Sequence, residues 1–104
     1  MLTLSITDDK NNVKVNLNGD LDIEGTEIVN EELLPKLINF SKVNVSLKEV
    51  PFVDSTGMGL LINLVKTLQE KGIVITISDV NKDVLEIFDL LQLPEILGTD
   101  VIVS

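Results

Sequence analysis

Hydrophobic and polar residues alternate with a period of two along the first part of the chain. The alternation covers residues 2–7 and resumes over residues 13–18, and the segment between them, Asp8–Asn12, has the composition of a turn. A period of two is typical of a strand with one buried face, so the pattern predicts two strands joined as a hairpin. Val43–Leu47 alternates in the same way, and the almost continuously apolar Ile73–Ile77 predicts a strand buried on both faces.

The apolar spacing changes to three and four residues between the second and third strands. This spacing is typical of an amphipathic helix, and it predicts a helix over Glu27–Phe40 with acidic residues on its other face. Pro35 lies inside this helix, where proline removes a backbone donor and clashes with the preceding turn. We therefore expect the helix to kink or break near Leu34.

Two more helices are predicted in the second half of the chain. The first covers Ser55–Lys71 and ends where Gly72 can adopt the left-handed conformation common at a helix C-terminus. The second covers Asn81–Gln92, with Asn81 or Asp79 as its N-cap. The residues expected to form their apolar faces are Met58, Leu60, Leu61, Ile62, Leu64, Val65 and Leu68 in the first helix, and Val84, Leu85, Phe88 and Leu91 in the second.

The order of these elements predicts the fold class. Strands that alternate with helices favour an α/β layer architecture, and the leading hairpin makes the sheet mixed. Pro94 opens a short turn, and Val101–Val103 is a candidate for a final strand. We expect a single domain over residues 1–104, an α/β fold with a mixed β-sheet of four to five strands and about four helices.

Composition narrows the possible chemistry. The chain has no histidine and no cysteine, which excludes Ser-His-Asp and Cys-His nucleophiles, zinc clusters and disulfides. Its 8 basic and 17 acidic side chains give a formal net charge of −9, which disfavours direct binding to nucleic acid and to anionic membranes. The first nine residues lack the basic region and the long apolar run of a signal peptide, and no apolar stretch in the sequence reaches the roughly 18 residues that span a membrane. We expect a cytoplasmic protein, a monomer or weak dimer, that is not an enzyme and has no cofactor or metal.

The segment from Asp54 to Gly59 joins an apolar strand to an apolar helix. Its simplest interpretation is a helix cap, in which Asp54, Ser55 and Thr56 accept hydrogen bonds from the first backbone N–H groups. A helix N-terminus also accommodates a phosphate, and Gly57 and Gly59 leave the first turn open to the backbone of another molecule. The lysine of a P-loop is missing, and no histidine can activate Ser55. Ser55 is therefore a better candidate for a substrate than for a catalyst.

Met58 and Leu60 have a second interpretation besides the core. They lie beside the two glycines at the start of the helix, where a side chain can protrude toward a partner. Methionine adapts well to such interfaces.

The segment from Asp20 to Glu31 imitates a calcium-binding loop. Asp20, Asp22, Glu24, Gly25 and Glu31 occupy positions 1, 3, 5, 6 and 12 of the EF-hand spacing. An EF-hand loop follows a helix, however, whereas this segment follows a predicted strand. We interpret it as a strand-to-helix loop with acids near the positive helix end, or as a loop that contacts a partner.

Three segments together resemble the STAS domains, and more narrowly the bacterial anti-sigma factor antagonists. They are Gly19–Asp22, Val53–Gly59 and the later stretch formed by Lys71–Ile73 and Leu85–Leu93, and the resemblance extends over essentially the whole chain. It implies a module that switches partners. In the family, an anti-sigma factor that is also a serine kinase phosphorylates the serine after the aspartate. The unphosphorylated antagonist binds the anti-sigma factor and frees the sigma factor, and a serine phosphatase resets the switch.

Carried over by position, the resemblance implies that Ser55 is the phosphorylation site and that a partner contacts the residues around it. The implied partner-binding residues are Asp20, Asp22, Asp54, Ser55, Thr56, Gly57, Met58 and Gly59. Asp20 stands where the family usually has glutamate, and Met58 where it usually has leucine. Two alternatives stay open: a stressosome-like STAS scaffold subunit, and a small nucleotide-binding domain in which Asp20, Asp22 and Asp54 hold Mg²⁺.

Overall fold

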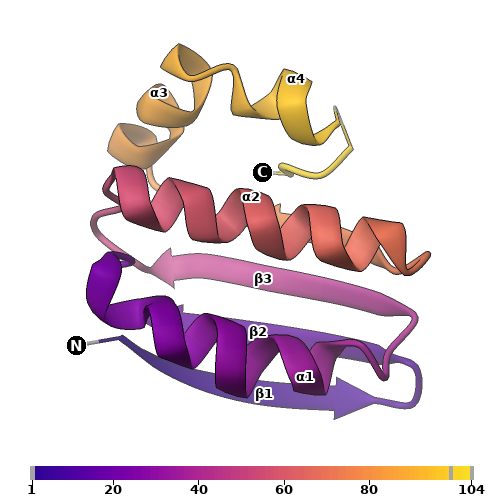
Figure 1. The fold of residues 1–104 in the computed structure, drawn as a ribbon. Helices are drawn as coiled ribbons and strands as arrows, with labels where there is room; N and C mark the ends of the chain where they lie inside the picture. Colours follow the sequence, from indigo (N-terminus) through magenta and orange to yellow (C-terminus); the bar gives the residue numbers. More distant parts are fainter. Residues whose placement is uncertain (1, 99, 104) are drawn as a thin grey trace.

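The strands form one mixed four-stranded sheet in the order β1-β2-β3-β4. A computed structural model describes residues 2–98 and 100–103, and Figure 1 shows its fold. β1 and β2 pair in antiparallel fashion, whereas β2 with β3 and β3 with β4 pair in parallel, which confirms the hairpin and the mixed sheet. The strands are β1 (Thr3–Asp9), β2 (Asn12–Asn18), β3 (Lys42–Glu49) and β4 (Val74–Ser78).

The predicted last strand is present as a short extension of the sheet at β4. Ile77 and Ile102 form a parallel bridge. The Ile77 N–H donates to the Val101 carbonyl at 2.7 Å, and the Val103 N–H donates to the Ile77 carbonyl at 2.9 Å. The C-terminal segment thus adds a minimal fifth strand at this edge.

Helical segments connect the strands and follow β4. They are the 3₁₀ turn η1 (Ile23–Gly25), the π-helical segment η2 (Ile28–Leu33), α1 (Leu34–Leu37), α2 (Ser55–Glu70), α3 (Lys82–Leu90) and α4 (Leu93–Leu97). Among the described residues, no helix is both long enough and apolar enough to cross a membrane.

The helix does not break near Leu34, since residues 26–37 are continuously helical; instead its hydrogen-bond pattern changes there from π-helical to α-helical, just before Pro35. The Leu34 N–H donates to the Val29 carbonyl, five residues earlier, so the π-helical segment ends there and α1 begins. Pro35 then lies in the first turn of α1, where a missing N–H costs least. The helical stretch ends at Leu37 rather than at Phe40.

The core lies between one face of the sheet and the helices. α1 and α2 run across that face (Figure 1). Buried residues alternate with more exposed ones along β2 and β4, and in β4 Ile75 and Ile77 are buried and Val74 is exposed. The prediction that residues 73–77 are buried on both faces is therefore wrong, because the helices cover only one face. On the other face Asn44 Nδ2 donates to Thr76 Oγ1 at 2.9 Å.

α3 packs more narrowly than its apolar pattern predicts. Val84 and Phe88, four residues apart, are buried. Leu85 and Leu91 are exposed, contrary to the prediction that they share the core face. The reason is geometric, since Leu85 lies a quarter turn away from Val84 and the helix ends before Leu91.

The C-terminus of α2 and the N-terminus of α3 lie within one residue of their predicted positions, whereas α3 ends at Leu90 rather than at Gln92. Gly72 follows α2 with a φ of 77°, the left-handed conformation that favours glycine. Of the two candidate caps of α3, the structure selects Asn81, whose side chain accepts a hydrogen bond from the Val84 N–H at 2.9 Å. Asp79 instead accepts a hydrogen bond from the Ser46 hydroxyl at 3.0 Å.

Candidate functional site

The two segments singled out in the sequence lie side by side at the ends of β2 and β3. Leu21 and Val53 form an isolated parallel bridge, and both side chains are buried. The Leu21 N–H donates to the Phe52 carbonyl at 3.0 Å, and the Asp54 N–H donates to the Leu21 carbonyl at 3.3 Å. The backbone around Leu21 is therefore anchored against the segment that leads into α2.

Asp54 is the N-cap of α2. Its backbone is extended and its Oδ1 accepts a hydrogen bond from the Gly57 N–H at 2.8 Å. Ser55 and Thr56 are the first two helical residues, and both are exposed. Because Asp54 alone supplies the cap, the hydroxyl of Ser55 lies at the surface at the start of a 16-residue helix.

Gly57 serves the fold rather than an outside molecule. It is buried, and a Cβ added there would overlap the Leu21 carbonyl oxygen and lie 2.9 Å from Val53 Cγ1. The expectation that Gly57 leaves the turn open to another backbone is therefore wrong. The backbone it accommodates is that of Leu21 in the same chain.

Gly59 differs from Gly57 in this respect. It is exposed, and an added Cβ would meet no atom within 4 Å. Its two neighbours in the sequence, Met58 and Leu60, are both buried. The expectation that these two side chains protrude toward a partner is wrong, because the core face of α2 is wide enough to take both.

Two exposed apolar side chains near the site were missed by the sequence analysis. Ile23, in η1, is 70% exposed, and Phe52, just before α2, is 50% exposed. Both residues lie close to the start of α2. η1 contacts α2, and the Phe52 carbonyl accepts a hydrogen bond from the Leu21 N–H. The alternation of Phe52 with the buried Val53 was a usable signal, since it turns Phe52 outward.

The acidic residues near the site do not gather into a metal centre. Asp20 is exposed, whereas Asp22 caps η1 by accepting a hydrogen bond from the Glu24 N–H at 3.0 Å. Within the described ranges, no three carboxylates lie together in a way that could hold a metal ion. The geometry thus gives no support to the alternative in which Asp20, Asp22 and Asp54 bind Mg²⁺.

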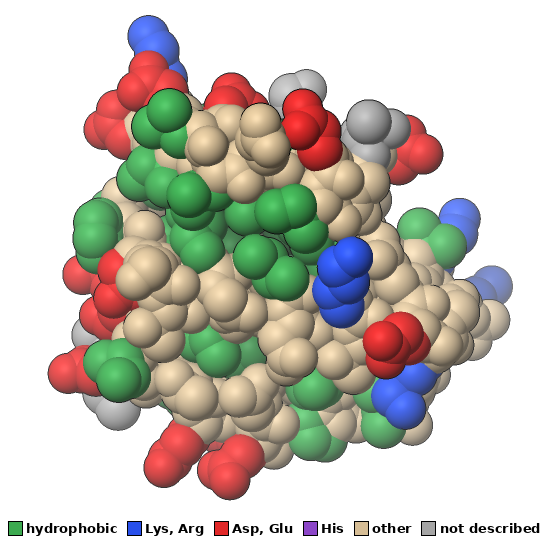
Figure 2. Space-filling model, turned by 45° about the horizontal axis from the view of Figure 1, so that its top comes forward, with side chains coloured by type: hydrophobic (Ala, Val, Ile, Leu, Met, Phe, Trp, Pro, Cys, Tyr) green, Lys and Arg blue, Asp and Glu red, His purple; other side chains and the backbone are tan. Residues whose placement is uncertain are grey.

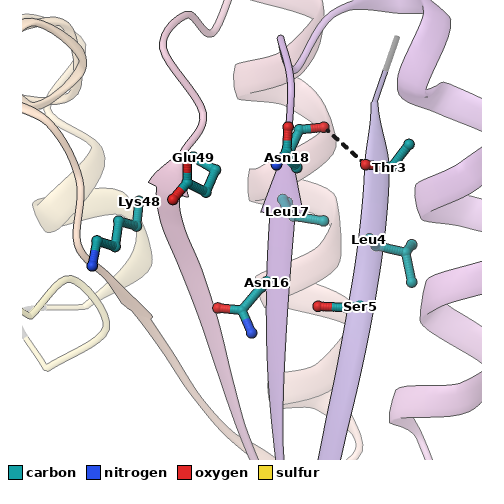
Figure 3. Close-up of a pocket in the computed structure, with 8 residues that line it drawn as sticks. All are labelled: Thr3, Leu4, Ser5, Asn16, Leu17, Asn18, Lys48 and Glu49. Carbon is teal, nitrogen blue, oxygen red and sulfur yellow. Dashed lines mark hydrogen bonds between the residues drawn. The ribbon is translucent and has the colours of Figure 1, made fainter.

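A hollow of about 350 Å³ lies on the uncovered face of the sheet (Figure 3). Its described lining residues are Thr3, Leu4, Ser5, Asn16, Leu17, Asn18, Lys48 and Glu49. Thr3 Oγ1 donates to the Asn18 carbonyl across it at 3.5 Å. None of the predicted site residues lines this hollow, so it is separate from the surface around Ser55.

Comparison with known proteins agrees with this geometry. The model of the STAS domain matches residues 3–102. The anti-sigma-B factor antagonist of Staphylococcus epidermidis is 31% identical over 93 residues, which cover 85% of this chain and 86% of that protein. The anti-sigma-B factor antagonist of Bacillus subtilis (strain 168) is 23% identical over 96 residues, which cover 92% of this chain and 88% of that protein.

A solved structure extends the comparison to the fold. The Bacillus cell fate determinant SpoIIAA, in its phosphorylated form, has a TM-score of 0.72 and 16% identity, with 98% of this chain and 92% of that chain covered. The family match includes every strand and helix described above. The chain therefore belongs to the STAS domain family.

Proposed function

We propose that this protein is a phosphorylation-controlled anti-sigma factor antagonist. The observation that carries the proposal is the position of Ser55, an exposed hydroxyl at the start of α2 whose capping position is already filled by Asp54. The names of the two relatives from Staphylococcus epidermidis and Bacillus subtilis support the general role.

In its unphosphorylated form the protein binds an anti-sigma factor that is also a serine kinase, and the sigma factor is released. The docking surface is the outward side of the first turn of α2 with its neighbours. It comprises Ile23, Phe52, Ser55, Thr56 and Gly59, all of them exposed. Apolar side chains beside a position without a Cβ give a partner both a contact and room to approach.

The kinase ends this interaction by phosphorylating Ser55. The Ser55 oxygen forms a bond to the γ-phosphorus of ATP, the bond to the bridging oxygen breaks, ADP leaves, and the hydroxyl proton passes to a base of the kinase. A serine phosphatase later hydrolyses the phosphate ester and restores the hydroxyl.

The fold should tolerate the phosphate while the docking surface changes. A phosphate adds about −1.5 to −2 charges. The N-terminus of α2 favours negative charge, and Ser55 is exposed, so the modification meets little resistance within the chain. A partner that approaches Ser55 must instead desolvate or match that charge. The phosphorylated SpoIIAA structure, which has the same fold, supports a fold that persists after phosphorylation.

Phosphorylation of the protein by its cognate kinase tests the acceptor. With ATP present, peptide mapping should find a single phosphate, on Ser55 and not on Thr56, and Ser55→Ala should abolish it. A phosphate on Thr56, or one that persists after Ser55→Ala, would contradict the assignment.

Binding measurements test the switch. Ser55→Asp should weaken binding to the anti-sigma factor at least tenfold, about 1.4 kcal/mol, because it adds charge to the docking surface. Its thermal stability should stay close to that of the native protein, since a carboxylate at a helix N-terminus is favoured by roughly 0.3–1 kcal/mol. Ser55→Ala is the matched control and should bind like the native protein. If Ser55→Asp and Ser55→Ala both bind like the native protein, the next measurement is the binding of protein phosphorylated on Ser55. Charge at Ser55 is rejected as the switch only if the phosphorylated protein also binds like the native protein.

A further inference from the structure

A second apolar surface lies on α3 and α4, away from the residues around Ser55. Leu90 is 80% exposed, Leu91 is 48% exposed and Ile96 is 44% exposed. We call these three residues the α3–α4 patch. Figure 2 shows hydrophobic side chains gathered over this upper part of the molecule. Isolated exposed leucines are ordinary, but a cluster of large apolar side chains marks an interaction site.

The chain turn between the two helices brings the patch together. Gln92, with a φ of 58°, turns the chain between the end of α3 at Leu90 and the start of α4 at Leu93, and the two helices contact each other. Lys66 of α2 donates to the Ile96 carbonyl at 3.2 Å. The patch is therefore held on a defined backbone, as a docking surface requires.

The fold does not need these side chains. α3 is attached through Val84 and Phe88, and α4 through Leu93 and Leu97, all of which are buried. Leu90 is the most exposed large hydrophobic residue in the part of the chain that the structure describes. Apolar exposure with no internal role indicates that the role lies in contact with another molecule.

The charges around the patch indicate what that molecule is. Asp83, Glu86, Asp89 and Glu95 are exposed on the same two helices. Two basic residues oppose them: Lys82 on α3, and Lys66 of α2, which donates to the Ile96 carbonyl. A hollow of about 430 Å³ beside Leu90 is lined by Glu86 and Asp89. It suits the aliphatic stem and charged end of a lysine or arginine. A second copy of this chain or an anionic membrane would bring further negative charge, and both are disfavoured.

We propose that the α3–α4 patch docks a basic amphipathic helix of a partner protein, with its apolar face on Leu90, Leu91 and Ile96 and its basic side chains toward Glu86 and Asp89. An amphipathic helix fits because its apolar stripe is flanked by side chains that reach such a rim. The patch contains no residue of the Ser55 surface, so the proposal stands independently of the proposed function.

Titration of the full-length protein with synthetic peptides tests the proposal. The probe is an amphipathic leucine–lysine helix of roughly 18 residues, about five turns. Its controls are a scrambled peptide of identical composition and a leucine–glutamate peptide with the same pattern. The amphipathic basic peptide should bind at least about tenfold more tightly than either control. In NMR spectra of the protein, it should shift the amides of α3 and α4. Equal binding of the scrambled peptide, or shifts confined to other elements, would overturn the proposal.

Two pairs of variants separate the apolar and the charged contributions. Leu90→Gln with Leu91→Gln should weaken binding at least about tenfold, whereas Ile38→Gln with Val74→Gln, exposed apolar residues elsewhere, should not. Glu86→Lys with Asp89→Lys, which leaves the apolar residues intact, should reverse the preference toward the acidic peptide.

Self-association provides the opposite outcome. If the native chain forms a dimer that Leu90→Gln with Leu91→Gln disrupts, the occupant is a second copy and the proposal is wrong. The proposal is also wrong if the native chain binds phospholipid vesicles and the variant with Leu90→Gln and Leu91→Gln does not.

Discussion

The first turn of α2 has an inward side and an outward side, and a glycine lies on each. Gly57 faces the Leu21 carbonyl so closely that no Cβ fits, whereas an added Cβ at Gly59 would meet no atom within 4 Å. The inward glycine is required by the packing of the chain on itself. The outward glycine meets no such requirement, although glycine is less favourable in a helix than any residue except proline. The proposed docking of a partner on this turn offers a reason for it.

The same division applies to the rest of the turn. On the inward side Leu21 and Val53 are buried and bridged, so they hold the backbone from which α2 starts. On the outward side Ser55 and Phe52 are exposed. We therefore expect a motif that looks continuous in the sequence to serve two purposes. Substitutions on its inward side should affect stability, and substitutions on its outward side should affect binding.

Gly57→Ala should give the largest effect. The added methyl group must displace the Leu21 backbone or shift the start of α2, and overpacking of this kind costs up to about 3 kcal/mol of unfolding free energy. The midpoint of thermal unfolding, followed by circular dichroism, should fall by roughly 15 °C for a domain of this size. A variant at least as stable as the native protein would show that Gly57 does not pack on Leu21. It would contradict the view that the inward side of the turn is required for stability.

Asp54→Ala should rank second. It removes the acceptor of the Gly57 N–H and should lower the unfolding free energy by about 1–2 kcal/mol, as measured by urea denaturation. Asp54→Asn keeps a capping oxygen and should change stability by only a few tenths of a kcal/mol. If the two variants were equally destabilised, the charge of Asp54 rather than its capping hydrogen bond would be the stabilising feature.

Much of this architecture follows from local patterns. The start of α2 at Ser55 and the left-handed Gly72 depend on residues close in the sequence, and both agree with the structure. The prediction that Ser55 is exposed at a helix start is also confirmed, since a polar residue before an apolar periodic run is a local signal. That Ser55 is phosphorylated stays a prediction.

The errors arose where distant parts of the chain decide the outcome. Which glycine faces inward depends on Leu21, which pairs with Val53 from 32 positions away in the sequence. Met58 is buried because the sheet and helices around α2 leave room for it. Val74 is exposed because helices cover only one face of the sheet. A sequence pattern gives the period of a segment, but it does not give the number of neighbours that surround it.

Phe52→Ser probes the outward side and should rank third. Aromatic side chains contribute strongly at protein interfaces, so the affinity for the anti-sigma factor should fall about tenfold, or 1.4 kcal/mol. Val74→Ser, at an exposed residue of β4 outside the site, is the matched control and should bind normally. Isothermal titration calorimetry measures both. If Phe52→Ser and Val74→Ser bind equally well, Phe52 lies outside the docking surface.

Gly59→Ala should change the free energy of unfolding least among these variants, and the sign of the change is informative. Alanine is the better helix former and an added Cβ meets no atom within 4 Å, so the free energy of unfolding should rise by about 0.4–1 kcal/mol. This is opposite in sign to Gly57→Ala, although the substitution is the same and the two positions share one turn. Binding to the anti-sigma factor should weaken at the same time, because the methyl group occupies the space through which the partner approaches the helix. Urea denaturation and calorimetry on the same preparation measure the two quantities together. A more stable variant with unchanged affinity would place the partner elsewhere, whereas a less stable one would mean that Gly59, like Gly57, serves the fold.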